Sequence, residues 1–411
     1  MSILKYLKRF IRQCLMNLIH FYFSRFRRKS IESGYQLLSL TEPDEHVFFG
    51  YYDKTPFDES ETRVLATRVP LTLYQNLSEA QVGYYTLSKK SSWNEIGKTK
   101  AWCWQLGTRL QWMGGGNDLV IYNDYINGSY ASVIYSTSER KTVRTLDMPV
   151  FDVNDNGTEA ITLDFSRLHR LRPGYGYMNI EDTTINDEAP ESSGIWSVNL
   201  RNGSKKLLFS IADIASISPM QSMKNAHHYF NHLMFNPSGN RFLFLHCWLS
   251  EGKRHSRLLT CNSDGSDLYP LIKSDHVSHY TWHNDKELLV YARHSDGKFF
   301  RMYSDRTESS HIIDKMHLSE DGHPSFRPGK KGNHILLDTY PSFFPEQKLY
   351  LYDMDSRKTK SLGAFFSSNL YRGSHRCDLH PRWSPSGNRI AFDSVFDGNK
   401  RGLHLLNLTN G

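Results

Sequence analysis

The sequence predicts an all-β protein, a seven-bladed β-propeller, preceded by a short amphipathic N-terminal helix. Two observations predict this fold. A segment recurs along the chain in which a histidine or basic residue is followed by an aromatic residue, a tight polar turn and an apolar run. The spacing of most copies is close to the ~40–45 residues of a four-stranded blade. Six or eight blades are the alternatives to seven.

The first thirty residues differ in charge from the rest of the chain. They contain eight lysines and arginines and no carboxylate, whereas the whole chain has a net charge of +7. The remaining residues therefore carry one net negative charge. Because a nucleic-acid-binding domain needs a basic surface, we expect no nucleic-acid partner for the folded body.

Residues 1–30 are expected to form a basic amphipathic helix at a membrane surface. Their apolar stretch, 14–23, is too short for the ~20 residues that cross a bilayer. Basic residues flank it on both sides and aromatic residues crowd its second half, which favours a helix lying on anionic headgroups. A signal peptide or short anchor is one alternative, and a helix packed on the body or a disordered tail is another.

The five cysteines indicate a reduced protein. Their number is odd and no CxxC spacing occurs, so neither a disulfide framework nor a cysteine-rich zinc site is expected. Together with the basic helix, this predicts a cytoplasmic protein, peripheral at the inner face of the membrane.

Four copies of the repeat are strong, and they open with His232, His279, His323 and His380. Each has an aromatic residue three positions later and then a polar turn of the kind that joins two antiparallel strands. Weaker copies open with Lys54, Arg109 and Val150. The third and fourth copies are 82 residues apart, and we interpret residues 166–194 as an insertion between them.

The propeller is expected to span residues 35–411. After the seventh hairpin the chain offers one further strand, 402–408, although a blade needs four. Residues 35–40 (YQLLSL) are apolar enough to supply the missing strand. That pairing would close the ring and leave no exposed sheet edge.

The innermost strand of each blade lines the central channel of a propeller. The repeat therefore places His232, His279, His323 and His380 around one mouth of the channel, and imidazoles that converge from separate blades are typical of a divalent-metal site. Lys54 and Arg109 occupy the matching positions of earlier blades. Histidines at such positions can also serve only to hydrogen-bond the backbone between blades.

Further polar residues are expected at the same mouth. Candidate catalytic residues are His227 and His228 on the adjoining loop, Tyr52 in the first blade, Arg109, and Tyr177 in the insertion. Candidate substrate-binding residues are Lys54, Arg293, His375 and Arg376. For any one of the tyrosines, packing is the competing interpretation.

The His-Pro-x-aromatic-Ser-Pro-x-Gly repeat resembles that of TolB-type propellers, and with the axial histidines it resembles the propeller polysaccharide lyases, such as oligogalacturonate lyase. The resemblance implies seven blades, a divalent cation such as Mn²⁺ and cleavage of uronic-acid glycosides by β-elimination. It implies that His323 and His380 are the best matches to the axial ligands, and that His227 or His228 is the base. The chain departs from the family near His380, where His375 and Asp378 stand in place of a glutamine, and in its basic N-terminal helix.

The function expected from this resemblance is that of a carbohydrate-active enzyme for an acidic oligo- or polysaccharide. The cation and Arg109 or Arg293 would neutralise a uronate carboxylate, a neutral histidine would remove the adjacent proton, and a tyrosine or histidine would protonate the leaving oxygen. Two alternatives remain open: a transferase or hydrolase of surface-polysaccharide biosynthesis at the cytoplasmic membrane, and a non-catalytic scaffold. A Gly-x-Ser-x-Gly hydrolase is not supported, because the motif does not occur.

Overall fold

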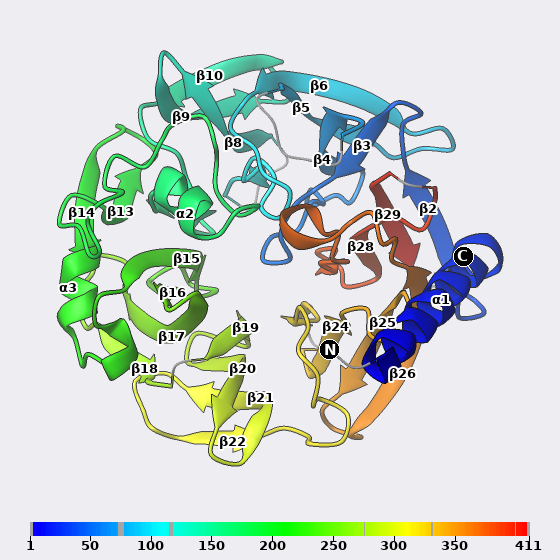
Figure 1. Cartoon of the computed structure of the whole chain (residues 1–411). Coiled ribbons are helices and arrows are strands. Elements are labelled where there is room, and N and C mark those ends of the chain that lie inside the picture. Colours follow the sequence, from blue (N-terminus) through cyan, green and yellow to red (C-terminus); the bar gives the residue numbers. More distant parts are fainter. Residues whose placement is uncertain are drawn as a thin grey trace.

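The prediction of a seven-bladed β-propeller is confirmed. The computed structural model describes residues 3–72, 78–114, 118–274, 276–329, 332–398 and 400–408. Within them, seven antiparallel sheets follow one another around a ring (Figure 1). Short helices, α2 (Phe165–Leu171) and α3 (Ile211–Ser216), lie in the third blade and after it, and α1 (Ile3–Phe26) precedes the ring.

The first four blades are each a four-stranded sheet in chain order. They are β3 (Glu45–Phe48), β4 (Arg63–Pro70), β5 (Ala80–Thr86), β6 (Ser92–Thr99); β7 (Gln111–Trp112), β8 (Leu119–Ile126), β9 (Ser129–Ser136), β10 (Lys141–Leu146); β11 (Asp152–Val153), β12 (Glu159–Thr162), β13 (Gly194–Asn199), β14 (Lys205–Ser210); and β15 (His227–Phe235), β16 (Arg241–Ser250), β17 (Lys253–Asn262), β18 (Tyr269–Ile272).

The last three blades involve the N-terminal segment as well. They are β19 (Val277–Trp282), β20 (Glu287–His294), β21 (Gly297–Ser304), β22 (Ser310–Ile312); β23 (Ser325–Phe326), β24 (His334–Asp338), β25 (Glu346–Asp353), β26 (Lys358–Phe366) with β1 (Lys29–Ile31); and β27 (Arg382–Trp383), β28 (Arg389–Ser394), β29 (Gly402–Asn407) with β2 (Gln36–Leu40).

In three repeats the aromatic residue is a tryptophan that joins neighbouring blades, which helps to explain the recurrence of aromatic residues at this position. The indole N–H groups of Trp112, Trp282 and Trp383 each donate to a carbonyl on the preceding blade, at 2.9, 3.4 and 3.3 Å. These three rings fill space between sheets and also satisfy buried polar groups there. The polar turn that follows has its own requirement: Gly387 has a φ of +66°, a conformation that favours glycine.

The N-terminal strand β2 pairs antiparallel with β29, where a closing strand was expected, and forms the outer edge of the seventh blade. Strand β1 was not expected. It pairs with β26 and adds a fifth strand to the sixth blade. Helix α1 is thereby held beside the sixth blade (Figure 1). No helix among the described residues combines the length and apolarity needed to cross a membrane.

The insertion in the third blade packs over one end of the channel. Its helix α2 is capped by Asp164, whose side chain accepts from the backbone N–H of residues 166 and 167. Arg167, buried on this helix, donates to four backbone carbonyls, one of them that of His228 on the fourth blade. Gly174 lies so close to the Ser374 carbonyl that a Cβ atom would clash with it. The insertion is therefore fixed against the fourth blade and the segment before β27.

Candidate functional site

The four predicted histidines converge on one end of the channel. The ring of Tyr52 has all four as neighbours, with centroids 5.2 Å from His232, 5.9 Å from His279, 5.1 Å from His323 and 6.3 Å from His380. All four histidines are at most 5% exposed. Positions one blade apart in sequence thus face each other across a small ring.

The channel end is filled by two tyrosines, one of which, Tyr52, was expected at this mouth. Tyr51 and Tyr52 follow strand β3 and enter the channel between the histidines. The Tyr52 hydroxyl donates to the Tyr280 carbonyl at 2.9 Å and accepts from the Tyr280 N–H at 3.1 Å. Tyr52 therefore lies at the site, but its hydroxyl is held by the backbone of the fifth blade, which makes it a packing residue and not the expected catalytic residue.

Two of the histidines have their tautomers fixed by acceptors at Nδ1. His323 donates from Nδ1 to Asp338 at 2.9 Å, and His380 donates from Nδ1 to the Gly50 carbonyl at 2.8 Å. Each ring therefore presents the lone pair of Nε2, the form in which histidine binds a metal. The Nε2 atom of His380 is buried and has no hydrogen-bond partner. An orphaned buried acceptor of this kind fits a cation ligand.

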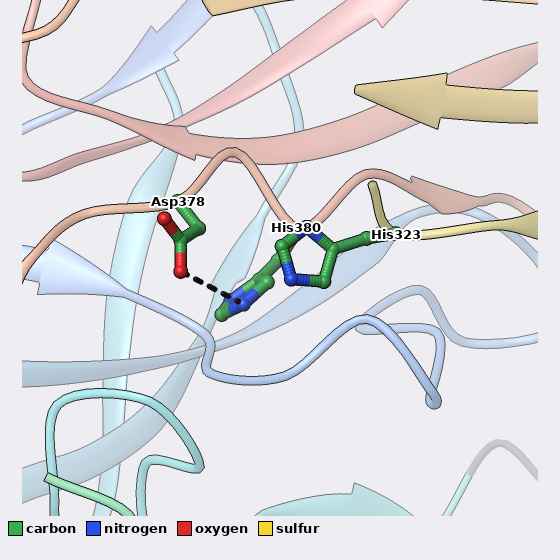
Figure 2. Close-up of side chains that lie close together, drawn as sticks. All are labelled: His323, Asp378 and His380. Carbon is green, nitrogen blue, oxygen red and sulfur yellow. Dashed lines mark ion pairs between the residues drawn. The ribbon is translucent and has the colours of Figure 1, made fainter. Parts of the chain in front are cut away.

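Asp378 completes a candidate metal centre with these two histidines. One donor atom each from His323, Asp378 and His380 lie within 4.8 Å of one another, and all three residues are buried. Figure 2 shows the carboxylate facing the imidazole of His380, with Oδ2 3.8 Å from Nε2. Two imidazoles and a carboxylate are a donor set for Mn²⁺ and similar divalent cations.

His279 has a different environment from the two ligand candidates. Its Nδ1 lies 2.8 Å from Oδ1 of Asp321, so that nitrogen carries the proton and Nε2 is left as an acceptor. The Tyr340 hydroxyl is 3.5 Å from His279 Nε2 and 3.4 Å from His323 Nε2. An imidazole oriented by a carboxylate, with an unprotonated Nε2, is the arrangement of a general base.

His232 belongs to the ring of histidines but not to the donor set. Its imidazole stacks on Tyr280 at 4.4 Å with an interplanar angle of 14°, and neither ring nitrogen has a partner. Burial lowers the pKa of His232 to about 3, so the ring is neutral. Its place in the structure is against Tyr280, at the edge of the cluster.

An open cleft of about 220 Å³ adjoins the histidines. The residues that line it include Tyr51, Arg172, Asn231, Arg254 and His279. The positive charge of Arg172 lowers the pKa of Arg254, because a like charge disfavours the charged form. The cleft therefore presents positive charge next to the candidate base.

A tyrosine between two arginines adjoins this cleft. Arg172 lies over the ring of Tyr175 at 4.2 Å, and Arg376 donates to the Tyr175 hydroxyl at 2.6 Å. Burial alone would raise the pKa of Tyr175, but Arg376 and Arg172 outweigh burial and lower it to about 8. Arg376 also donates to Asp378 at 2.7 Å. The predicted substrate-binding residue Arg376 thus lies between the phenol and the candidate metal centre.

Two of the predicted basic residues have structural partners instead. Arg109 makes a bidentate pair with buried Asp53, at 3.1 and 2.8 Å, and donates to the Phe151 carbonyl. Lys54 lies 2.5 Å from Asp152 and donates to the Val153 carbonyl. Both charges are paired with buried carboxylates, and these contacts give no support to the catalytic role expected for Arg109 or to the substrate-binding role expected for Lys54.

The catalytic roles expected for Tyr177 and His228 are also wrong. Tyr177 is fully buried, stacks on Phe165 at 4.3 Å and accepts from Asn123. Arg257 donates to Nδ1 of His246, so His246 must donate from Nε2 to His228, which in turn donates to the Met223 carbonyl. All ring nitrogens of His246 and His228 therefore have hydrogen-bond partners, and His228 has no free lone pair to offer a substrate.

The other candidates lie at the border of the site. By strand alternation, His227 shares a face of β15 with the cleft residues Tyr229 and Asn231, but stands farther out. Arg293 is exposed at the end of β20, and His375 donates to the Leu370 carbonyl. None of these three is among the residues that line the cleft.

The fold is that of a class of propellers built like the solved oligogalacturonate lyases. One solved oligogalacturonate lyase, in complex with manganese, has a TM-score of 0.64 and 14% identity, covering 92% of this chain and 95% of that one. Another, from Vibrio parahaemolyticus, has a TM-score of 0.59 and 12% identity, covering 92% and 96%. The tricorn protease has a TM-score of 0.50 and 12% identity, covering 87% of this chain and 34% of the protease.

These likenesses establish the architecture and confirm the resemblance seen in the repeats. No family model matches the sequence, and no curated protein matches it either.

Proposed function

We propose that this protein is a metal-assisted lyase that cleaves an acidic, uronate-containing saccharide by β-elimination at the mouth of the channel. The observation that carries the proposal is the pair of buried imidazoles, His323 and His380, whose Nδ1 atoms are occupied and which lie with Asp378 close enough to share a cation, beside a cleft lined with two arginines. The architecture shared with oligogalacturonate lyases, one of them in complex with manganese, supports it.

Substrate recognition follows from the charges around the cleft. Arg172 and Arg254 line it, and Arg376 lies next to Tyr175 at its edge. A planar guanidinium binds a carboxylate with two parallel hydrogen bonds, so a uronate matches this lining better than a neutral sugar does. A carboxylate bound there makes the adjacent C–H more acidic, because negative charge that develops on the carbon is shared with the carboxylate.

The chain's own residues can move both protons of the elimination. Nε2 of His279 takes the proton from C5, the carbon next to the carboxylate, and Asp321 stabilises the imidazolium that forms. The C4–O bond breaks as the C4–C5 double bond forms. The Tyr175 hydroxyl donates its proton to the departing oxygen, and Arg172 and Arg376 stabilise the phenolate. The products are a 4,5-unsaturated uronate and a saccharide with a new hydroxyl.

His323, Asp378 and His380 would hold the divalent cation. When bound, the cation supplies positive charge that stabilises the carboxylate's developing negative charge. Asp338 positions His323, and the Gly50 carbonyl positions His380. Tyr51 and Tyr52 fill the channel behind the histidines and exclude water there.

The proposal is tested by incubating the Mn²⁺-loaded protein with acidic oligosaccharides and recording the ultraviolet absorbance of the unsaturated product. We expect His279→Gln to lower kcat by about 10²–10⁴-fold, the usual contribution of a general base. His283→Gln, at the position directly after the same strand, is the matched control and should retain activity.

Other results would overturn the proposal. Cleavage with new reducing ends but no double bond would indicate a hydrolase, and consumption of a sugar nucleotide would indicate a transferase. A protein that binds no divalent cation and turns over none of these substrates would be a scaffold.

A further inference from the structure

Helix α1 has two apolar faces, and the propeller covers only one of them. On the covered face, Phe23 is 6% exposed and packs with Phe365 and Phe366 of β26, while the ring of His20 lies 5.0 Å from that of Phe366. The opposite face is a stripe at helical spacing whose members are 47–70% exposed: Leu7, Phe10, Ile11, Leu15, Leu18, Phe21, Tyr22 and Phe26. An exposed stripe of this size marks an interaction surface.

The exposed stripe continues onto the propeller. Phe343 and Phe344, in the loop between β24 and β25, are 46% and 50% exposed, and Phe344 stacks near Phe23 at 5.7 Å. Leu370, in the segment between β26 and β27, is 47% exposed. Its neighbour Asn369 donates from its backbone N–H to His20 at 3.0 Å. We call this combined surface, the α1 stripe with Phe343, Phe344 and Leu370, the apolar face.

The charged residues that α1 contributes around the apolar face are all positive. Lys5, Lys8, Arg12 and Arg25 are exposed, and residues 1–30 contain no carboxylate. Among the described residues, no ion pair joins a basic residue of α1 to an acidic residue of the propeller. Apolar residues bordered by unpaired cations match the boundary between the acyl chains and the headgroups of an anionic bilayer.

The same two loops connect the apolar face to the site. Tyr340, next to His279 and His323, lies three residues before Phe343. Arg376 and Asp378 lie a few residues after Leu370 in the segment that ends at β27. The mouth of the channel and the apolar face are thus at the same end of the propeller.

We infer that the apolar face docks onto an anionic lipid bilayer and that the propeller's own loops, not the helix alone, enter the interface. The mouth of the channel then lies at the membrane-facing end of the protein. The inference goes beyond the proposed reaction, because it concerns where the protein sits and not what it cleaves.

The test is co-sedimentation of the full chain with vesicles of phosphatidylcholine, with and without about 30% phosphatidylglycerol, an anionic content of the order found in cytoplasmic leaflets. We expect binding only with the anionic lipid, and weakening as salt rises. The double variant Phe343→Ser, Phe344→Ser leaves the helix intact and should reduce partitioning by about tenfold, since two half-exposed rings no longer enter the lipid. Val143→Ser, 51% exposed on β10, is the matched control and should bind like the parent.

A fluorescent label tests whether the loop itself meets the lipid. Cys14 is exposed and the other four cysteines are buried, so Cys14→Ser leaves a chain suited to labelling at one position. A polarity-sensitive dye on Leu370→Cys should shift to shorter wavelength on anionic vesicles, whereas the same dye on Val143→Cys should not. His380→Ala, which removes a proposed metal ligand, should leave both results unchanged.

Three outcomes would overturn the inference. They are equal binding to neutral and anionic vesicles, unchanged binding of the Phe343→Ser, Phe344→Ser variant together with an unshifted Leu370→Cys label, and formation of a dimer through α1 with no vesicle binding.

Discussion

Replacing Asp338 by asparagine should weaken divalent-cation binding without removing any ligand. Asp338 accepts from Nδ1 of His323 at 2.9 Å and from its backbone N–H at 2.8 Å, and it is 2% exposed. It also accepts from the His380 backbone N–H at 3.3 Å. The carboxylate therefore fixes the position of one ligand candidate and helps to position the other.

The size of the effect follows from these contacts. An asparagine amide keeps one acceptor oxygen, loses the negative charge and turns an N–H₂ group toward the donors. Removing a carboxylate that orients a metal-binding histidine costs about 10–100-fold in affinity, or roughly 1.4–2.8 kcal/mol. The loss should appear in the dissociation rate of the cation, because the ligands themselves remain.

The assay is titration of the metal-free protein with Mn²⁺, followed by the free Mn²⁺ signal in electron paramagnetic resonance. Asp393→Asn is the matched control: Asp393 has the corresponding position in the seventh blade but accepts from Arg382 and the Phe49 N–H, and not from either ligand histidine. The reasoning would be refuted if Asp338→Asn bound Mn²⁺ with the same affinity as the parent while thermal unfolding curves showed that both proteins are folded.

Three further predictions concern stability, the proton donor and closure of the ring. Burial lowers the pKa of His46 and His228 to about 4 and that of His404 to about 3, so between pH 6.5 and 4 only the unfolded chain takes up protons at these histidines. The free energy of unfolding, measured with urea, should therefore be full above about pH 6.5 and fall below it, by about 1–2 kcal/mol per histidine at pH 5. Constant stability across that range would contradict it. Tyr175→Phe should lower kcat and abolish a fall in kcat/KM above about pH 8, since a donor whose pKa is about 8 is lost as the pH rises; an unchanged pH profile would exclude Tyr175 as the acid. A truncation that removes residues 1–40 lacks strand β2, whereas one that removes residues 1–34 keeps it. The first should have a free energy of unfolding about 3 kcal/mol lower than the second, because buried Leu40 and the pairing with β29 are lost. Equal stability of the two truncations would show that β2 does not hold the ring closed.

The fold could be predicted because one physical requirement repeats in several blades. An aromatic residue on the inner strand must reach the neighbouring blade, and a polar turn must follow it, so the pattern survives where other residues vary. Strand β1 escaped prediction because Lys29–Ile31 is a short basic segment whose pairing depends on where α1 places it. Tyr52 was expected at the mouth of the channel, but its hydrogen bonds to the Tyr280 backbone were not, because they depend on how far the chain after β3 enters the channel.

The candidate site was predictable in part, for the same reason. The copies that open with His232 and His380 share a left-handed backbone, with φ of +47° and +43°, so equal positions in the repeat become equal positions in space. The repeat also gave Arg109 this conformation, with φ of +51°, but could not reveal that Asp53 pairs with it. A charge at a repeated position does not by itself indicate whether it faces a ligand or a neighbouring blade.

The remaining site residues come from segments outside the repeat. Arg172 and Tyr175 belong to the insertion, whose position depends on the contacts of buried Arg167. Asp378 did carry a usable signal: it stands two residues before His380, and in an extended segment alternate side chains point the same way. Asp321 and Tyr340 lie in loops between strands, where the sequence does not determine direction.

The most direct test of the account is pulsed electron paramagnetic resonance of the protein loaded with one equivalent of Mn²⁺. Two imidazole nitrogens should couple to the metal in the parent protein and one in His380→Ala, while His232→Gln should keep two. Absence of nitrogen coupling in the parent, or its persistence unchanged in His380→Ala, would contradict a metal centre at the mouth of the channel.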